Sequence, residues 1–163
     1  MQTVDRTEFI SAMRNVASSV SVVTTNGPAG RHGATGSAFC SVSADPPTVL
    51  VCLNAGSKIA DCVKQNGLFR LNVLPDGASG IANRFAGLDD ADVTDRFDGM
   101  PVWGDVPCIS GATSLACKVR QTTQEATHLI CIGRVTEVTL GADLPLTYLA
   151  GRYHRLTQSE ALQ

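Results

Sequence analysis

The sequence is poor in charged and in aromatic side chains. Charged residues make up 17% of the 163 residues and aromatic residues 5%, with a single tryptophan. Thirteen basic residues against fifteen acidic residues leave a net charge of −2. A protein that binds the phosphate backbone of nucleic acid needs a basic excess or stripe, and one that stacks bases needs aromatic platforms. The composition therefore argues against a nucleic-acid-binding protein.

Long apolar segments are also missing. The longest fully apolar run, Val49–Leu53, is far too short to cross a bilayer. The N-terminal residues include Asp5, Arg6 and Glu8 and contain no apolar core of a signal peptide. We therefore predict a protein that is not inserted in a membrane and that resides in the cytoplasm.

The six cysteines show no metal-binding pattern. They occupy positions 40, 52, 62, 108, 117 and 131, and no pair has the C-x-x-C spacing of zinc or redox motifs. Each has small or apolar neighbours, which is typical of buried free thiols that pack as small hydrophobic side chains. We expect no metal site, and a reducing compartment fits these thiols.

Length and composition together predict one domain over residues 1–163. A chain of this length buries enough surface to form a full hydrophobic core, and hydrophobic residues make up 44% of it. Such a low charge content leaves little polar surface for a small monomer. We therefore expect part of the surface to be covered by a second copy of the chain in a homodimer.

Hydrophobic periodicity predicts a mainly β protein with peripheral helices. An apolar stripe predicts a helix capped by Thr7 and running to about Ala17, and further helices are expected from Ser57 and over 78–86. The expected strands cover 20–25, 39–43, 48–53, 69–74, 114–125 and 128–140, of which the last two form a hairpin. We expect residues 87–113 to form a surface excursion, and the tail to hold a short helix and a last strand. Because several strands follow one another directly, the pattern favours an antiparallel barrel over a parallel sheet.

The most informative stretch is the buried strand that ends at Asn54 and leads into a helix at Ser57. Free N–H groups at a helix start, a serine hydroxyl and the ammonium of Lys58 together suit a phosphate group. The stretch is equally compatible with an ordinary capped helix whose lysine is solvated.

A second candidate site is the small-residue segment Gly33–Ala38. Small side chains let a flat ligand or a phosphate approach the backbone, and Thr35 and Ser37 add hydroxyl groups. The segment lacks both the G-x-G-x-x-G pattern and the P-loop pattern. A tight corner of a barrel would have the same composition.

His128 stands at the predicted hairpin and is the third candidate. A histidine there serves either as a structural hydrogen-bonding group or as a functional one. The sequence offers it no Ser-His-Asp arrangement and no cluster of metal ligands.

Taken in order, these segments resemble the flavin reductase-like family, whose fold is the FMN-binding split barrel. The resemblance rests on residues 20–25, 33–43, 45–54 and 69–74, on Arg84-Phe85-Ala86 and Asp95-Arg96-Phe97, on Thr127-His128 with Gly133, and on Gly151-Arg152-Tyr153-His154. It runs from about Phe9 to about His154, and it is strongest toward the short reductase components of two-component flavin-dependent monooxygenases.

The resemblance implies a six-stranded antiparallel Greek-key split barrel, a homodimer, and NADH-dependent reduction of FMN or FAD. Reduced flavin would then pass to a separate oxygenase component. The implied flavin-contacting residues are Thr35, Gly36, Ser37, Ala38, Cys52, Leu53, Asn54, Ser57, Lys58, Arg84 and Phe85. His128, as the catalytic residue, and Tyr153 would lie beside the nicotinamide.

The chain departs from the family pattern at the hairpin and beside the flavin. Many members have Gly-Asp-His where this chain has Ala126-Thr127-His128, and a usual pair of serines is Ser37-Ala38 here. Two other interpretations stay open. One is a flavin- or haem-binding module without turnover, and the other is an oxidase of a phosphorylated pyridoxal-type substrate.

Overall fold

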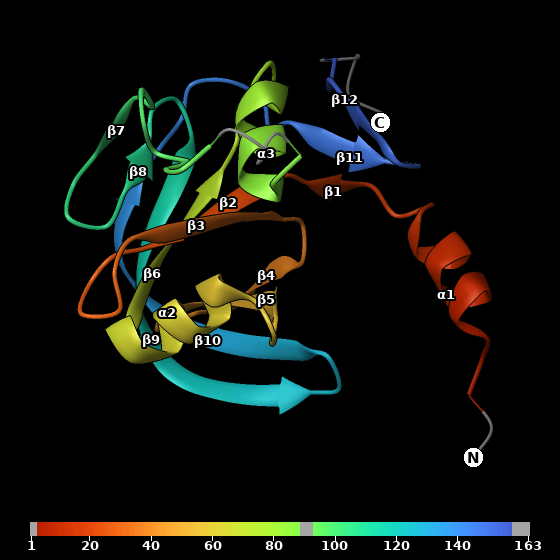
Figure 1. Ribbon diagram of the computed structural model, residues 1–163. Helices are drawn as coiled ribbons and strands as arrows, with labels where there is room; N and C mark the ends of the chain where they lie inside the picture. The colour runs from red at the N-terminus through yellow and green to blue at the C-terminus, as the bar shows by residue number, and fades with distance from the viewer. Residues whose placement is uncertain (1–2, 89–92, 158–163) are drawn as a thin grey trace.

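The computed structural model describes residues 3–88 and 93–157. In chain order the elements are α1 (Arg6–Met13), β1 (Ser18–Ser19), β2 (Ser21–Thr25), β3 (His32–Gly36), β4 (Phe39–Ala44), β5 (Pro47–Asn54), α2 (Lys58–Asn66), β6 (Leu68–Val73), α3 (Ser79–Ala86), β7 (Val102–Trp103), β8 (Cys108–Ile109), β9 (Thr113–Glu125), β10 (His128–Thr139), β11 (Thr147–Leu149) and β12 (Arg152–His154). Figure 1 shows the sheet with α2 and α3 packed beside it.

The main sheet is open and antiparallel, with the strand order β3-β2-β6-β9-β10-β5-β4. Its two edge strands, β3 and β4, are consecutive in the chain and are separated only by Ser37 and Ala38. If β3 and β4 are counted as one bent strand, the sheet has the six strands of a split barrel. The predicted class, mainly β with peripheral helices, is confirmed.

Two groups of buried side chains form the core. The first lies between the sheet and α2 and includes Val51, Ile59 and Phe69. The second lies against α3 and includes Val22, Phe85 and Ile109. Because α2 places four of its nine residues in the core, its amphipathic face fixes the helix beside β2 and β3.

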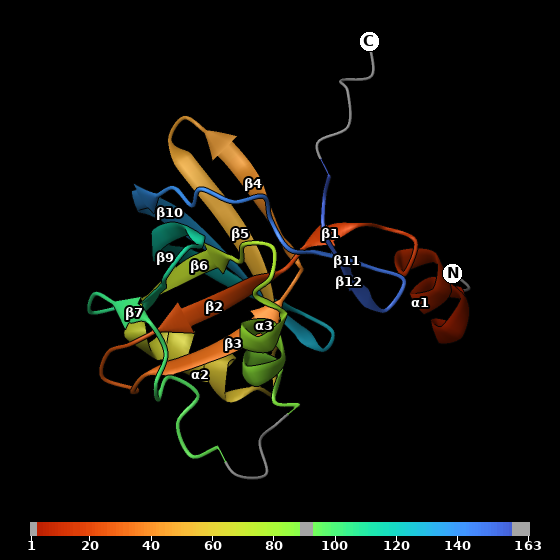
Figure 2. The same cartoon turned by 90° about the horizontal axis from the view of Figure 1, so that it is seen from above.

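Helix α1 differs from the sequence prediction at both ends. It begins after Asp5, whose carboxylate accepts a hydrogen bond from the Thr7 N–H at 2.8 Å, and it ends at Met13. Thr7 is therefore not the cap, and the helix does not reach Ala17. No residue of α1 is buried, and Figures 1 and 2 both show the helix to one side of the sheet, next to β1.

The region from 87 to 113 and the tail also differ from the prediction. Phe97 and Ile109 are buried in the second core group, so the described part of this region is not only a surface excursion. The tail forms the strand pair β11 and β12 in place of the expected helix and single strand. Within the described ranges no helix combines the length and the apolar character needed to cross a membrane.

The cysteines are all free thiols, but they are not all buried. Cys62, Cys108, Cys117 and Cys131 are buried, whereas Cys40 is exposed and Cys52 is half-buried. Burial raises the pKa of Cys117 to about 12 and that of Cys131 to about 11.

Strand β6 is buried on both faces, although its sequence alternates. Asn72, on the face expected to be polar, donates to the Val22 carbonyl at 3.1 Å and to Thr24 Oγ1 at 3.2 Å. Its Oδ1 accepts hydrogen bonds from the Ile109 N–H at 3.1 Å and from Ser114 Oγ at 2.9 Å. One amide group thus joins β2, β6, β8 and β9.

We predict that Asn72→Ala lowers the free energy of unfolding by about 3 kcal/mol, because it leaves several buried polar groups without partners. Urea denaturation followed by circular dichroism measures this loss. Asn15→Ala, at an exposed position just after α1, is the matched control and should change stability by less than about 0.5 kcal/mol. Equal effects of the two substitutions would contradict the prediction.

Candidate functional site

The first candidate site lies where the chain passes from β3 to β4, and we call it the β3–β4 cavity. Its volume is about 290 Å³. The lining residues are Ser21, Val23, Ala34, Thr35, Gly36, Ser37, Ala38, Phe39, Val51, Cys52, Leu53, Asn54, Ser57, Ile59 and His128. Segments that are distant in sequence therefore meet at the open edge of the sheet.

The β3–β4 cavity suits a flat, largely uncharged ring. None of its lining residues is an acid, a lysine or an arginine. At Gly36 an added Cβ would project into open space with no atom within 4 Å, and the neighbouring Ser37 and Ala38 are exposed and small. A ring can therefore come close to the backbone of this segment.

The polar groups of the cavity are largely committed to the protein itself. Thr35 Oγ1 donates to the Ala82 carbonyl at 2.7 Å, which ties β3 to α3. Ser57 Oγ donates to the Asn54 carbonyl at 2.5 Å, and Asn54 Oδ1 accepts from the Gly56 N–H at 2.9 Å.

Ser57 occupies the N-cap position of α2, which begins at Lys58, but its hydroxyl does not cap the helix as predicted. The Ser57 hydroxyl bonds to the Asn54 carbonyl in the preceding turn. It therefore does not accept a hydrogen bond from the first N–H groups of α2. A nine-residue helix with such an end offers partial positive charge to an anion.

His128 lies at the start of β10, directly opposite Asn54 on β5. Its Nδ1 is 3.0 Å from the hydroxyl oxygen of Thr127. A hydroxyl group can donate to Nδ1 and thereby leave the proton of a neutral imidazole on Nε2. The side chain of the residue before His128 therefore orients the ring, although it carries no charge.

The thiol of Cys52 does not supply a nucleophile to this cavity. Burial raises its pKa, and the neighbouring Cys40 raises it further. The group is therefore a neutral thiol at neutral pH, and it contributes polarizable surface.

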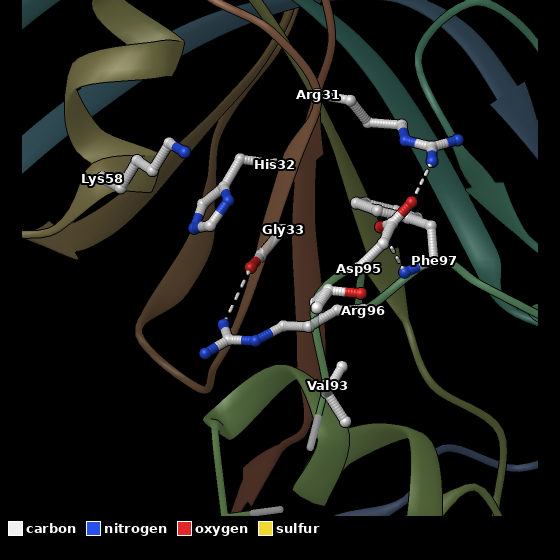
Figure 3. Close-up of a pocket in the computed structure, with 9 residues that line it drawn as sticks. Arg31, His32, Gly33, Lys58, Val93, Asp95, Arg96 and Phe97 are labelled. Carbon is white, nitrogen blue, oxygen red and sulfur yellow. Dashed lines mark hydrogen bonds and ion pairs between the residues drawn. The ribbon is translucent and has the colours of Figure 1, made fainter. Parts of the chain in front are cut away.

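A larger second cavity adjoins the first, and we call it the basic cavity (Figure 3). Its volume is about 600 Å³, and it is lined by Arg31, His32, Gly33, Lys58, Val93, Thr94, Asp95, Arg96 and Phe97. Arg31 pairs with Asp95 at 2.5 Å and lies over the Phe97 ring. The hydrogen bond from the Phe97 N–H and the Arg31 guanidinium hold the pKa of Asp95 below its usual range, so Asp95 is ionised.

The structure brings nine of the predicted site residues together in the β3–β4 cavity: Thr35, Gly36, Ser37, Ala38, Cys52, Leu53, Asn54, Ser57 and His128. Lys58 lines the basic cavity instead. Tyr153 lines a third, smaller cavity on the other side of Thr35, Gly36 and Ser37, and its hydroxyl is 3.0 Å from Asn83 Oδ1.

Arg84 and Phe85 line neither the β3–β4 cavity nor the basic cavity. The Arg84 guanidinium donates to the carbonyls of Asp98 at 2.7 Å and Asp95 at 3.3 Å. Phe85 is 1% exposed and packs edge-on against Phe97. In this structure both residues support the segment that carries Asp95.

Sequence reasoning missed several residues that line the two cavities. Phe39, Val51 and Ile59 read as core residues because nothing in a hydrophobic pattern separates a cavity wall from a packed interior. The sequence prediction places no strand at Arg31 and His32, yet His32 opens strand β3. The cluster of Arg31, His32 and Arg96 joins positions far apart in the chain, so no local spacing reveals it.

Comparisons with known proteins identify the family of this chain. The family model for the flavin reductase like domain matches residues 13–157. The FMN reductase (NADH) RutF of Pantoea ananatis is 36% identical over 97% of this chain and 85% of its own length. The 4-hydroxyphenylacetate 3-monooxygenase reductase component of Pseudomonas aeruginosa is 32% identical over 91% of this chain and 90% of its own length.

Solved structures give the same result. The Streptomyces globisporus NADH:FAD oxidoreductase SgcE6, in complex with NAD and FAD fragments, superposes with a TM-score of 0.87 at 26% identity, covering 99% of this chain and 100% of that one. The family match spans most of the sequence, and the likeness extends over the whole sheet. This chain belongs to the flavin reductase-like domain family.

Proposed function

We propose that this chain is a single-domain, NADH-dependent flavin reductase that reduces FMN or FAD. The observation that carries the proposal is the β3–β4 cavity, which is uncharged, is open above Gly36 and adjoins the uncapped start of α2. Such a cavity fits a flat ring, and the helix start fits the phosphate attached to it. The bound flavin supplies the chemistry by accepting a hydride from NADH.

The chain's own residues act by binding and orientation. The backbone of Gly36, Ser37 and Ala38 would lie against the ring, and the apolar side chains of Val51 and Leu53 would help to exclude water from it. The N–H groups at the start of α2 and the ammonium of Lys58 would hold the phosphate. Hydride transfer requires no protein acid or base at the reacting carbon, so positioning of the two cofactors is the main task of the protein.

His128 is the residue that we assign to the nicotinamide. It stands at the rim of the β3–β4 cavity, and the Thr127 hydroxyl orients its ring. Held in this way, the ring of His128 would contact the nicotinamide of bound NADH and orient it.

The product of this reaction needs an acceptor. Relatives named as reductase components of monooxygenases support a separate oxygenase that receives reduced flavin from this chain. We also propose a cytoplasmic location, since all six cysteines are free thiols and a reducing compartment keeps them so.

Turnover tests the function directly. The protein mixed with NADH and either FMN or FAD in air should consume NADH, because reoxidation of free flavin by oxygen sustains the cycle. The measurement is the loss of the near-ultraviolet absorbance of NADH, with protein without flavin as the control. Bound pigment without NADH consumption would instead indicate a binding module and would contradict the proposal.

We predict that His128→Ala lowers kcat/KM for NADH about tenfold, equivalent to about 1.4 kcal/mol, while the Kd for FMN stays the same. The loss follows from removing the group that orients the nicotinamide. His154→Ala is the matched control, because His154 bonds only the Leu149 carbonyl among the described residues and lies outside the cavity. Unchanged NADH kinetics in His128→Ala would overturn the assignment.

Two apolar surfaces support a homodimer. The first is an apolar stripe formed by Phe9, Ile10 and Met13 of α1 and by Val16 just after the helix, which are 37–56% exposed. The second is the outer face of β4, β5 and β10. Because Val49, Val51 and Leu53 face the core, the alternate residues Leu50 and Cys52 face outward. Their cross-strand partners Ile132 and Ile130 share that face.

The outer face of β4, β5 and β10 includes Cys52, which also lines the β3–β4 cavity. A second copy that covers this face would therefore lie beside the flavin. Burial of these aliphatic side chains supplies the driving force for association.

We predict that the protein scatters light with the mass of two chains at micromolar concentration. Met13→Glu should weaken the dimer about tenfold, because it places a charge in the apolar stripe that the second copy would cover. Ser11→Glu adds the same charge to α1 away from the stripe and should leave the dimer intact. A monomeric wild-type protein, or equal effects of the two substitutions, would contradict this arrangement.

A further inference from the structure

A further cavity, which we call the outer cavity, lies beside β6, β9 and the end of β10 that is distant from His128. Its volume is about 400 Å³. It is lined by Leu68, Phe69, Arg70, Trp103, Gly104, Asp105, Val106, Ala116, Cys117, Lys118, Thr136 and Glu137. Figures 1 and 2 show β7, which carries Trp103, on the side of the molecule opposite to α1. The outer cavity shares no lining residue with the β3–β4 cavity or the basic cavity, so the proposed flavin site does not account for it.

The segment that forms one wall of the outer cavity is fixed to the sheet. Thr24 Oγ1 donates to the Pro107 carbonyl at 2.6 Å, and Asn26 Nδ2 donates to the Asp105 carbonyl at 2.8 Å. Within the segment, β7 pairs with β8. Trp103 is nevertheless 46% exposed. The wall is therefore formed in advance and presents an indole ring that the protein itself leaves half uncovered.

Arg70 places a buried charge in the outer cavity. Its neighbour Phe69 packs in the core with α2, so Arg70 points to the opposite face of β6. Arg70 is 6% exposed, and its cross-strand partner on β9 is the short side chain of Ala116. The Nε of Arg70 is buried and has no hydrogen-bond acceptor among the described residues. Since buried polar groups are normally paired, a free N–H on a buried guanidinium indicates a place for an acceptor.

Glu137 pairs with Arg70 but uses only part of its hydrogen-bonding capacity. Nη1 and Nη2 of Arg70 both donate to Glu137 Oε1 at 3.2 Å, and Nη1 is 3.5 Å from Ser114 Oγ. A guanidinium binds a carboxylate best through two parallel hydrogen bonds to two oxygens. The Glu137 side chain is 57% exposed, so it can turn into solvent. A carboxylate from solution can then take its place and bind the guanidinium through both oxygens.

We propose that the outer cavity binds a small aromatic monocarboxylate, whose carboxylate replaces that of Glu137 on Arg70. The aromatic ring of the ligand would lie against the indole of Trp103, and the volume of the cavity suits a molecule of this size. The other charged residues of the lining, Lys118 and Asp105, have opposite signs. A single negative charge on the ligand fits best, because a second one would meet Asp105 and the displaced Glu137.

The fluorescence of the protein tests this proposal without flavin. Trp103 is the single tryptophan of the chain, so its emission reports on the outer cavity. Titration of the flavin-free protein with phenylpropionate should give a saturable change in that emission. Propionate lacks the ring and phenylpropanol lacks the carboxylate, so neither should saturate in the same concentration range. Phenylpropionate should also leave the KM for FMN unchanged, since the two cavities share no lining residue.

Two substitutions should change the Kd for phenylpropionate in opposite directions. Glu137→Gln removes the competing carboxylate and should lower the Kd about fivefold. Arg70→Lys keeps the charge but not the two parallel donors and should raise the Kd about tenfold. Glu8→Gln, at an exposed position of α1, is the matched control that removes one negative charge elsewhere, and it should leave the Kd unchanged. Because Glu137 is exposed, Glu137→Gln tests the proposal even if Arg70→Lys does not fold, which circular dichroism shows.

Tighter binding by Glu137→Gln than by the wild type and by Glu8→Gln would identify Arg70 as the carboxylate site. The absence of a saturable fluorescence change with phenylpropionate would overturn the proposal. Equal binding of phenylpropanol, or a Kd that Glu137→Gln raises or leaves unchanged, would also overturn it. Competition between phenylpropionate and FMN would place the ligand in the β3–β4 cavity and would contradict the proposal as well.

Discussion

The architecture depends on one covalent constraint, which is that a single bent segment supplies both edges of the sheet. β3 pairs with β2 and β4 pairs with β5, and only Ser37 and Ala38 connect them. The described strands β3 and β4 are at opposite ends of the strand order and do not pair with each other, so the sheet stays open at this point. The β3–β4 cavity lies at the split. Its floor is backbone and small side chains because the chain has to turn there.

The same segment connects the two halves of the core. At Gly33 an added Cβ would lie 2.6 Å from the Phe85 ring and 3.1 Å from Phe97, so only glycine allows α3 and the following segment to pack so closely. Thr35, two residues later, bonds to α3 through the Ala82 carbonyl. Strand β3 thus positions the wall of the basic cavity and the floor of the β3–β4 cavity together.

Much of the sheet could be predicted from sequence because its strands have strong local signals. The β-branched run before Asn54 shows where that strand ends. The two long strands around His128 are likewise bounded by the short turn between them. The environments of other residues depend on tertiary packing, which the local sequence pattern does not show. Asn72 looks like a surface residue in an alternating strand, but the segment around Ile109 covers it and uses its amide. Nine of the predicted site residues meet in one cavity because two ordered sequence segments and the hairpin carry them. Arg31 and Arg96 come together only through the tertiary fold, so no sequence spacing marks them.

The central claim is that flavin binds where β3 turns into β4. Titration of isotope-labelled protein with FMN, followed by the chemical shifts of its backbone amides, tests this most directly. Flavin bound there should cause the largest shifts at residues 34–38, 52–54 and 57–59, with small changes elsewhere on the sheet. Shifts centred instead on the outer cavity beside Trp103 and Arg70, with residues 34–38 unchanged, would contradict it.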